Sequence, residues 1–345
     1  MRLAQASALI RRRPPARPSR VLIVVIAALA GAPLVAGCQG AGTGSGNAAR
    51  TTELTVAAIS GIDNAPLYIA ARSGVFARAG LHVTIRSYRS VGQELQALNK
   101  GGVDIAAGDY VDFFYSQATS RNPDLRIVAD GYHAAPGVME VVTTPNSGIT
   151  TPQNLAGKTI GTPQPQGIPI RKGKPYSLET LATWSVLTND GVDPSQVTWK
   201  PLPAGELIRA LLSHKVDAIL VQEPSILEAE SRLGVLEVLD SCSGATANLP
   251  LSGYFAVDAF VRKHAQALRE FRSALQEAQA SAVLPGPVRE VLAHDPGMSM
   301  QSASMVTTGT YPTSLNAGSL QRVADLMFSF EMLSRTLDVG TMFVR

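Results

Sequence analysis

Hydrophobic and polar positions follow two alternating patterns along most of the chain. Short runs rich in Val, Ile and Thr, typical of strands, are followed by segments with helical spacing that begin at a capping residue and end at glycine. The first half predicts strands at 53–59, 81–87, 103–107 and 125–130, a helix from Asn64 to about Ala79, one from Ser90 to Asn99 and one capped by Asp109. This alternation predicts the α/β class, with a mostly parallel sheet flanked by helices.

The same alternation recurs further along the chain. Strands are predicted at 158–162, 196–202 and 216–221, and helices at 176–188 and 204–213. In the first half Val83-Thr84-Ile85 precedes Val103-Asp104-Ile105, and in the second half Val197-Thr198-Trp199 precedes Val216-Asp217-Ala218 at nearly the same separation. The matched spacing predicts two similar βαβ lobes.

The last third of the chain is mainly helical. After a predicted strand at 252–257, helices are expected at 264–283, 288–293 and 319–334. Phe328, Phe330 and Met332 lie in the last of these, and we expect them to pack in the core.

The N-terminus has the composition of an export signal. Residues 1–37 contain six arginines and no acidic residue, and the apolar stretch that follows the arginines is interrupted by Gly31 and Pro33. It is too short for a spanning helix of about 20 residues, so we expect a signal peptide. Arg11-Arg12-Arg13 resembles a twin-arginine signal, but the two prolines that follow depart from that pattern, so the export route stays open between Sec and twin-arginine.

The signal ends in Leu34-Val35-Ala36-Gly37-Cys38, which resembles a bacterial lipobox. That resemblance implies lipidation of Cys38; the alternative is an ordinary signal peptide with a coincidental cysteine. Residues 38–52 are rich in Gly, Ala, Ser and Thr and are expected to form a flexible tether.

Composition excludes several classes of function. Without residues 1–37 the chain keeps 24 basic and 27 acidic residues, so the mature part is mildly acidic, and we expect no nucleic-acid partner. Two cysteines exclude a disulfide scaffold, and no histidine pair has metal-binding spacing. No nucleophile elbow or phosphate loop occurs, and Cys242 is expected to be a buried thiol. We therefore expect binding, not catalysis, with no cofactor and no metal.

Several short segments between Leu54 and Pro224 resemble type II periplasmic binding proteins of ABC importers, and most closely their nitrate/sulfonate/taurine and thiamine-pyrimidine binding group. In chain order these segments are Ala65-Pro66-Leu67-Tyr68-Ile69-Ala70, Gly74-Val75-Phe76, Gly101-Gly102-Val103-Asp104-Ile105, Asn154-Leu155-x-Gly157-Lys158-Thr159-Ile160-Gly161, Val216-Asp217-Ala218 and Glu223-Pro224.

The resemblance implies the two-lobed periplasmic-binding-protein type II fold with a helical C-terminal segment. The first lobe would comprise positions 53–140 and 252–345, the second lobe positions 141–251, and the chain would cross near 137–143 and 242–252. A small solute (sulfonate- or taurine-like, nitrate-like, or a pyrimidine or other heteroaromatic) would bind between the lobes. The protein would be an extracytoplasmic monomer anchored to the membrane by Cys38, with ABC permease and ATPase subunits as partners.

Ligands of open α/β sheets bind beyond the carboxyl ends of the strands, so the loops there supply the candidate site. The predicted ligand-binding residues are Ser60, Gly61, Asp63, Asn64, Tyr88, Ser90, Gly108, Asp109, Tyr110, Tyr132, His133, Thr162, Gln164, Gln166, Gln222, Glu223 and Tyr254.

Each of these residues also has a purely structural interpretation. Asp109, Glu223 and Ser90 could serve only as helix caps, and Gly108 only as a turn residue. With carboxylates at the helix N-termini, a nitrate-like anion is not strongly favoured, whereas tyrosines and glutamines suit a heteroaromatic or zwitterionic ligand. Two other classes stay open: an enzyme on the same fold, although the cysteine-rich segment of the related pyrimidine synthase is absent, and a tethered sensor.

Overall fold

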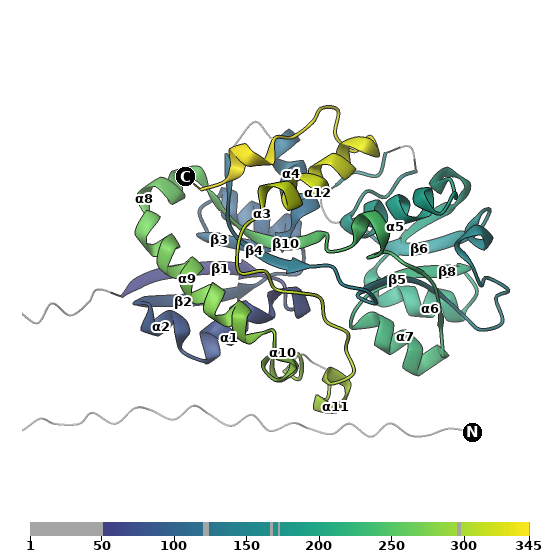
Figure 1. Ribbon diagram of the computed structural model, residues 1–345, viewed down its shortest axis with the longest axis horizontal. Coiled ribbons are helices and arrows are strands. Elements are labelled where there is room, and N and C mark those ends of the chain that lie inside the picture. Colours follow the sequence, from purple (N-terminus) through teal and green to yellow (C-terminus); the bar gives the residue numbers. More distant parts are fainter. Residues whose placement is uncertain (1–50, 120–123, 166–167, 172, 295–297, 345) are drawn as a thin grey trace, which may run out of the picture. The chain divides into compact units, whose positions relative to one another are not determined.

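The strands form two five-stranded sheets (Figure 1). The structure, a computed structural model, describes residues 51–119, 124–165, 168–171, 173–294 and 298–344. The first sheet has the order β2 (Leu81–Ser87), β1 (Thr52–Ala58), β3 (Ile105–Asp109), β10 (Pro250–Val257) and β4 (Leu125–His133). The second has the order β7 (Thr198–Leu202), β6 (Thr159–Pro163), β8 (Ala218–Gln222), β5 (Met139–Thr143) and β9 (Leu236–Asp240).

Each sheet is mixed, with one strand reversed. β10 runs antiparallel to both β3 and β4, and β5 runs antiparallel to both β8 and β9, while the other four strands of each sheet share one direction. The predicted α/β class with two mostly parallel sheets is therefore confirmed. We call the part built on the first sheet lobe 1 and the part built on the second sheet lobe 2; all the described residues belong to one compact unit.

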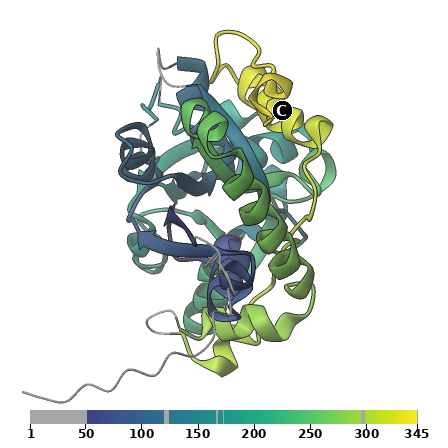
Figure 2. The same ribbon diagram turned by 90° about the vertical axis from the view of Figure 1, so that its left-hand side faces the viewer.

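Helices flank both sheets. Lobe 1 carries α1 (Ala65–Arg72), α2 (Val75–Arg78), α3 (Val91–Asn99), α4 (Tyr110–Thr119), α8 (Asp258–Lys263), α9 (Ala265–Ser281), α10 (Pro285–Leu292), α11 (Met300–Ala303) and α12 (Ala317–Ser329). Lobe 2 carries α5 (Leu178–Asn189), α6 (Leu207–Leu212) and α7 (Ser225–Leu233). The long helix α9, green in Figure 2, lies against α1 and α2, where Phe271 stacks on Phe76 with ring centroids 5.3 Å apart.

Two predictions about helices are corrected. The helix expected from Asn64 to Ala79 is two helices, because Gly74 takes a positive φ of 71° that ends the first and starts the second. Phe328 is not a core residue: its side chain is 44% exposed, while Met332 is buried as expected.

The chain passes between the sheets twice. It leaves β4 at His133 and enters β5 at Met139, and it leaves β9 at Asp240 and enters β10 at Pro250. Residues 139–143, expected in the first crossing, are instead the buried strand β5. In addition α12 contacts both α4 and α5, so the C-terminal segment touches each lobe.

The repeated Val-Asp pair forms the same joint in both lobes. The carboxylate of Asp104 accepts a hydrogen bond from the backbone N–H of Thr55 in β1 at 2.8 Å. The carboxylate of Asp217 accepts one from the backbone N–H of Thr159 in β6, also at 2.8 Å. In each case the aspartate ties the entry of a later strand, β3 or β8, to its parallel neighbour, β1 or β6, which explains the matched spacing in the sequence.

Aromatic residues fill the interior of lobe 1. Phe255 of β10 stacks on Phe113 with ring centroids 4.0 Å apart and meets the edge of Tyr110 at 5.5 Å. These rings are fully buried between the first sheet and α4. Among the described residues, no helix is both long enough and apolar enough to cross a bilayer.

Candidate functional site

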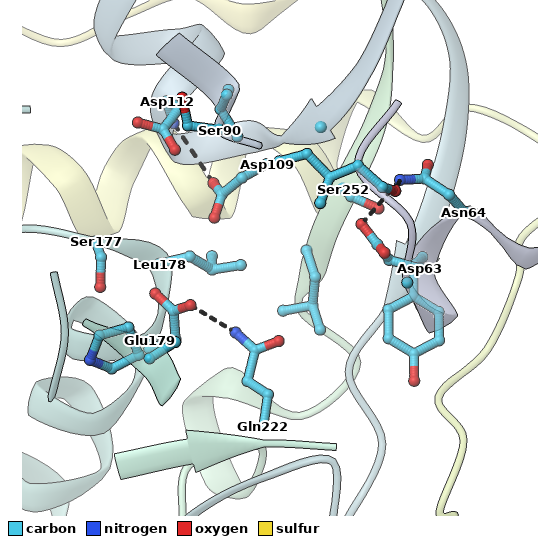
Figure 3. Close-up of a pocket in the computed structure, with 18 of the residues that line it drawn as sticks. Asp63, Asn64, Ser90, Asp109, Asp112, Ser177, Leu178, Glu179, Gln222 and Ser252 are labelled. Atoms are coloured by element: carbon cyan, nitrogen blue, oxygen red, sulfur yellow. Dashed lines mark hydrogen bonds between the residues drawn. The ribbon is translucent and has the colours of Figure 1, made fainter. Parts of the chain in front are cut away.

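A cavity of about 460 Å³ is lined by residues of both lobes (Figure 3). Lobe 1 contributes the loop after β1, the residues at the start of α3, the junction of β3 with α4, and the start of β10. Lobe 2 contributes the ends of β6 and β8 and the start of α5. The carboxyl ends of β1, β3, β6 and β8 thus meet at this cavity, as expected for a ligand site of an open α/β sheet.

Most of the predicted site residues line this cavity. They are Ser60, Gly61, Asp63, Asn64, Ser90, Gly108, Asp109, Tyr132, Gln164, Gln222 and Glu223. Three have structural tasks as well: the Ser90 side chain caps α3, Asp109 accepts from the N–H of Val111 at the start of α4, and Asn64 donates to the carbonyl of Ile59 at 2.9 Å.

Five predicted residues do not line the cavity. Tyr110 is buried and donates its hydroxyl to Asp130 at 2.7 Å, and His133 lies 2.9 Å from the other oxygen of the same carboxylate. Tyr254 is buried against Phe271, with ring centroids 6.0 Å apart. These three side chains lie on faces of their strands or helix that point into the interior of lobe 1, not toward the cavity.

Thr162 is fully buried at the end of β6, and Tyr88 is half-buried outside the lining. Gln166 and Cys38 lie outside the described residues. Of the four tyrosines among the predicted ligand-binding residues, only Tyr132 lines the cavity; its ring lies 5.1 Å from that of Tyr311.

Several lining residues were not predicted. They include Asp112, Ile168, Tyr176, Ser177, Leu178, Glu179 and Ser252. A local signal marks two of them: Ser177 and Thr180 form a capping box at the start of α5, and Asp112 lies three residues after Asp109, on the same face of α4. The approach of Asp112 to Glu179, which lies in the other lobe, has no signal in the local sequence.

The helices that start at the cavity have their own caps. The Ser90 hydroxyl accepts from the N–H of Gln93 at 3.4 Å, and the Ser177 hydroxyl accepts from the N–H of Thr180 at 3.3 Å. Asp109 fills the corresponding place at α4. Free N–H groups at helix N-termini attract anions, and these side chains occupy some of them.

The carboxyl groups of the cavity resist ionisation. Burial raises the pKa of Asp63 to about 6, and burial together with the nearby Glu179 raises the pKa of Asp112 to about 7. Burial, followed by Asp112 and Glu179, raises the pKa of Asp109 well above its usual value. Gln222 donates its amide to Glu179 at 2.8 Å. The cavity is therefore an acidic environment in which negative charges oppose one another.

Glu223 is held by the backbone. Its carboxylate accepts from the N–H of Leu227 at 3.2 Å, at the start of α7, and from the N–H of Thr307 at 3.0 Å. Glu223 therefore both caps a helix of lobe 2 and ties that lobe to the segment before α12. Among the described residues, no group of His, Cys, Asp or Glu is arranged to hold a metal ion.

Residues 62–285, more than half of the chain, match the sequence profile of the family described as NMT1/THI5 like. The chain belongs to the NMT1/THI5-like family. A search of curated protein sequences finds no significant match.

Solved structures share the fold of this NMT1/THI5-like chain at low sequence identity. The periplasmic aliphatic sulphonate binding protein SsuA from Escherichia coli has a TM-score of 0.68 at 19% identity, covering 85% of this chain and 97% of SsuA. The periplasmic nitrate-binding protein NrtA from Synechocystis PCC 6803 has a TM-score of 0.64 at 13% identity, covering 85% of each chain.

The desulfurization enzyme DSZB also matches, with a TM-score of 0.63 at 17% identity, covering 85% of this chain and 96% of DSZB. The NMT1/THI5-like chain therefore has the periplasmic solute-binding protein fold, and that fold occurs in binding proteins and in an enzyme.

Proposed function

We propose that this protein is the extracytoplasmic solute-binding component of an ABC importer, which captures one small organic molecule between its lobes. The observation that carries the proposal is the cavity lined by the strand ends of both lobes. Its volume of about 460 Å³ is within the usual range for metabolite sites, roughly 300–1,000 Å³. The shared fold of SsuA and NrtA, which are periplasmic binding proteins, supports it.

Two short crossings between the lobes support a hinge mechanism. Residues 134–138 and 241–249 link the two sheets. Changes in φ and ψ over such connections can close two lobes on a ligand. In the closed state, Asp109 and other lining residues of lobe 1 would contact the same molecule as Glu179 of lobe 2, and the closed form would dock on the permease.

Binding is favoured over catalysis by the chemistry of the lining. The described residues that line the cavity include no cysteine and no histidine. The one cysteine in the described part, Cys242, is 1% exposed, and burial raises its pKa to about 12, so its thiol is a poor nucleophile.

The importer function can be tested without knowing the ligand. The protein is reconstituted in proteoliposomes with the permease and ATPase encoded beside its gene, and ATP hydrolysis is measured with and without a small-molecule filtrate of cell extract. We expect hydrolysis to rise only when the protein and the filtrate are both present. Absence of such neighbouring genes, or a rate of ATP hydrolysis that is the same with and without the protein, would contradict the proposal.

We further propose that Cys38 carries the lipid anchor, because it follows small residues at the end of the signal peptide. Cells grown with an alkyne-labelled palmitate should yield a labelled wild-type protein in the membrane fraction. Cys38→Ser should lose the label and leave the membrane, whereas Cys242→Ser, the matched control, should keep both. Equal labelling of wild type and Cys38→Ser would refute the anchor.

A further inference from the structure

The cavity has a large excess of acidic side chains. Five carboxyl groups line it, and Arg89, at an exposed position, is the one basic residue among the described lining residues. The carboxyl groups are those of Asp63, Asp109, Asp112, Glu179 and Glu223. Figure 3 shows Asp109 and Asp112 on one side of the cavity and Glu179, with Gln222, on the opposite side.

These carboxyl groups have no cationic partners within the described part of the chain. The ion pairs found there involve other acidic residues. Asp109 and Glu223 accept backbone N–H groups, and Glu179 accepts the Gln222 amide, whereas the side chain of Asp112 accepts no hydrogen bond from any described residue. Desolvated carboxylates without counter-ions are unfavourable, so the free protein keeps a charge arrangement that a ligand could satisfy.

A second, independent feature lies in the wall of the cavity. Glu94 of α3 is completely buried, and neither of its carboxyl oxygens has a hydrogen-bond partner among the described residues. Its Oε2 lies only 3.2 Å from the place where a side chain on Gly108 would begin, and Gly108 lines the cavity. Burial, followed by the charges of Asp63 and Asp112, raises the pKa of Glu94, so its carboxyl group interacts electrostatically with two lining residues.

Glycine at position 108 leaves this carboxyl group next to the cavity. A Cβ there would come within 2.9 Å of the Phe113 ring as well as 3.2 Å of Glu94. A buried acidic group without a hydrogen-bond partner, next to a glycine that lines the cavity, is difficult to explain by packing alone. An apolar residue would fill the same space without the cost of desolvation. The acidic group is explained if the occupant of the cavity supplies hydrogen-bond donors.

Anionic occupants fit the cavity poorly. Asp109 already occupies the N-terminus of α4, and Ser90 and Ser177 cap α3 and α5. A sulfonate or nitrate would meet carboxyl groups on both sides of the cavity.

We infer that the ligand is a small organic cation whose ammonium, amidinium or guanidinium group binds between Asp109 and Asp112 of lobe 1 and Glu179 of lobe 2. The inference rests on the proposed binding function and names its ligand class. The cation supplies the missing N–H donors and neutralises the opposed charges of the two lobes, so its binding draws the lobes together. Ile168, Tyr176 and Leu178 provide an apolar wall for the rest of the molecule.

Probes of matched shape and opposite charge test the inference. Isothermal titration and thermal unfolding are recorded for the full chain carrying Cys38→Ser, with benzamidine, agmatine and putrescine as cations. Benzenesulfonate, butanesulfonate and nitrate serve as anions, benzamide as the neutral control, and Ca²⁺ and Zn²⁺ as metal ions. We expect saturable binding of at least one organic cation and none of the anions.

Isosteric variants assign the binding to the carboxyl groups. Asp112→Asn and Glu179→Gln should each lower the affinity for the cation at least about tenfold, since each removes one charge-assisted contact. Both should unfold at the same or a higher temperature than the parent when no ligand is present, because like-charge repulsion is relieved. Glu277→Gln, on the exposed surface, should leave the affinity unchanged.

Three outcomes would overturn the inference: saturable binding of an anion in place of the cations, binding of the metal ions alone, or no saturable binding by any of the three organic cations. None of these would affect the importer function, which the ATPase measurement with the metabolite filtrate tests separately.

Discussion

The free energy of unfolding of the ligand-free protein should fall by several kcal/mol between about pH 5 and pH 9, and Glu94→Gln should remove a large part of that fall, most clearly above about pH 7. Burial, followed by the charges of Asp63 and Asp112, raises the pKa of Glu94 from 4.5 to about 9. The cause is geometric, because the carboxyl group is fully buried without a hydrogen-bond partner among the described residues.

The direction follows from proton binding in the two states. Below about pH 4.5, Glu94 is protonated in both the folded and the unfolded chain and contributes no pH dependence. As the pH rises toward 9, the unfolded chain releases this proton while the folded protein retains it, so the unfolded state is progressively favoured. The shift corresponds to a loss on the order of 5 kcal/mol, to which Asp63 and Asp112 add in the lower part of the range.

Urea unfolding curves at a series of pH values measure this effect. Glu94→Gln keeps the shape of the side chain and removes its ionisation, so the stability of the variant should fall less with rising pH than that of the parent, most clearly above about pH 7. Glu277→Gln, whose parent side chain is 61% exposed, should follow the parent curve. A parent protein of constant stability over this range, or a Glu94→Gln variant with the parent's slope, would show that Glu94 is not held protonated.

Local patterns were sufficient to predict the two-lobed fold. The alternation of apolar runs with capped helices located β1, β2, β3 and β4 in lobe 1 and β6, β7 and β8 in lobe 2. The repeated Val-Asp pair carried information because Asp104 and Asp217 make equivalent hydrogen bonds to β1 and β6, the parallel neighbours of the strands that they precede. Such signals depend on neighbours in the sequence or on the recurring geometry of a βαβ unit.

β5 was missed because it follows the turn at Gly137, where a hinge crossing was expected, and β9 was not predicted either. The loops after the strands located most of the cavity lining, but the directions of the aromatic side chains could not be predicted. Tyr110 directly follows the end of β3, where a site residue would be expected, and Tyr254 lies within β10, yet both point into the interior of lobe 1.

The acidic character of the cavity was predicted only in part. Asp63, Asp109 and Glu223 were identified from their places after strands, whereas Asp112 and Glu179 meet across the lobes and lie far apart in the chain. Only the packing of the two sheets determines that such distant residues face one cavity, so no local sequence motif predicts them. The burial of Glu94 behind Gly108 likewise depends on the packing of α3 on β3.

Closure of the lobes on a ligand should be a large structural change, because lining residues of both lobes must converge on one molecule. Spin labels at two exposed positions follow this closure: Lys100→Cys, just after α3 in lobe 1, and Arg209→Cys, on α6 in lobe 2, both in the chain carrying Cys38→Ser. Cys242, buried in the described structure, should not be labelled. Labelled protein carrying Glu179→Gln provides the matched control for contacts across the cavity.

The most direct test of ligand capture between the lobes is the distance distribution of these two labels, recorded by pulsed electron paramagnetic resonance with and without a small-molecule filtrate of cell extract. A mass spectrum of the native protein verifies in the same samples that one small molecule is bound. The account predicts a broad distribution at longer distance in the free protein and a narrower one at shorter distance when the molecule is bound. In Glu179→Gln, a smaller fraction of the molecules should show the shorter distance. An unchanged distance distribution in protein that carries a bound small molecule would contradict capture by closure of the two lobes.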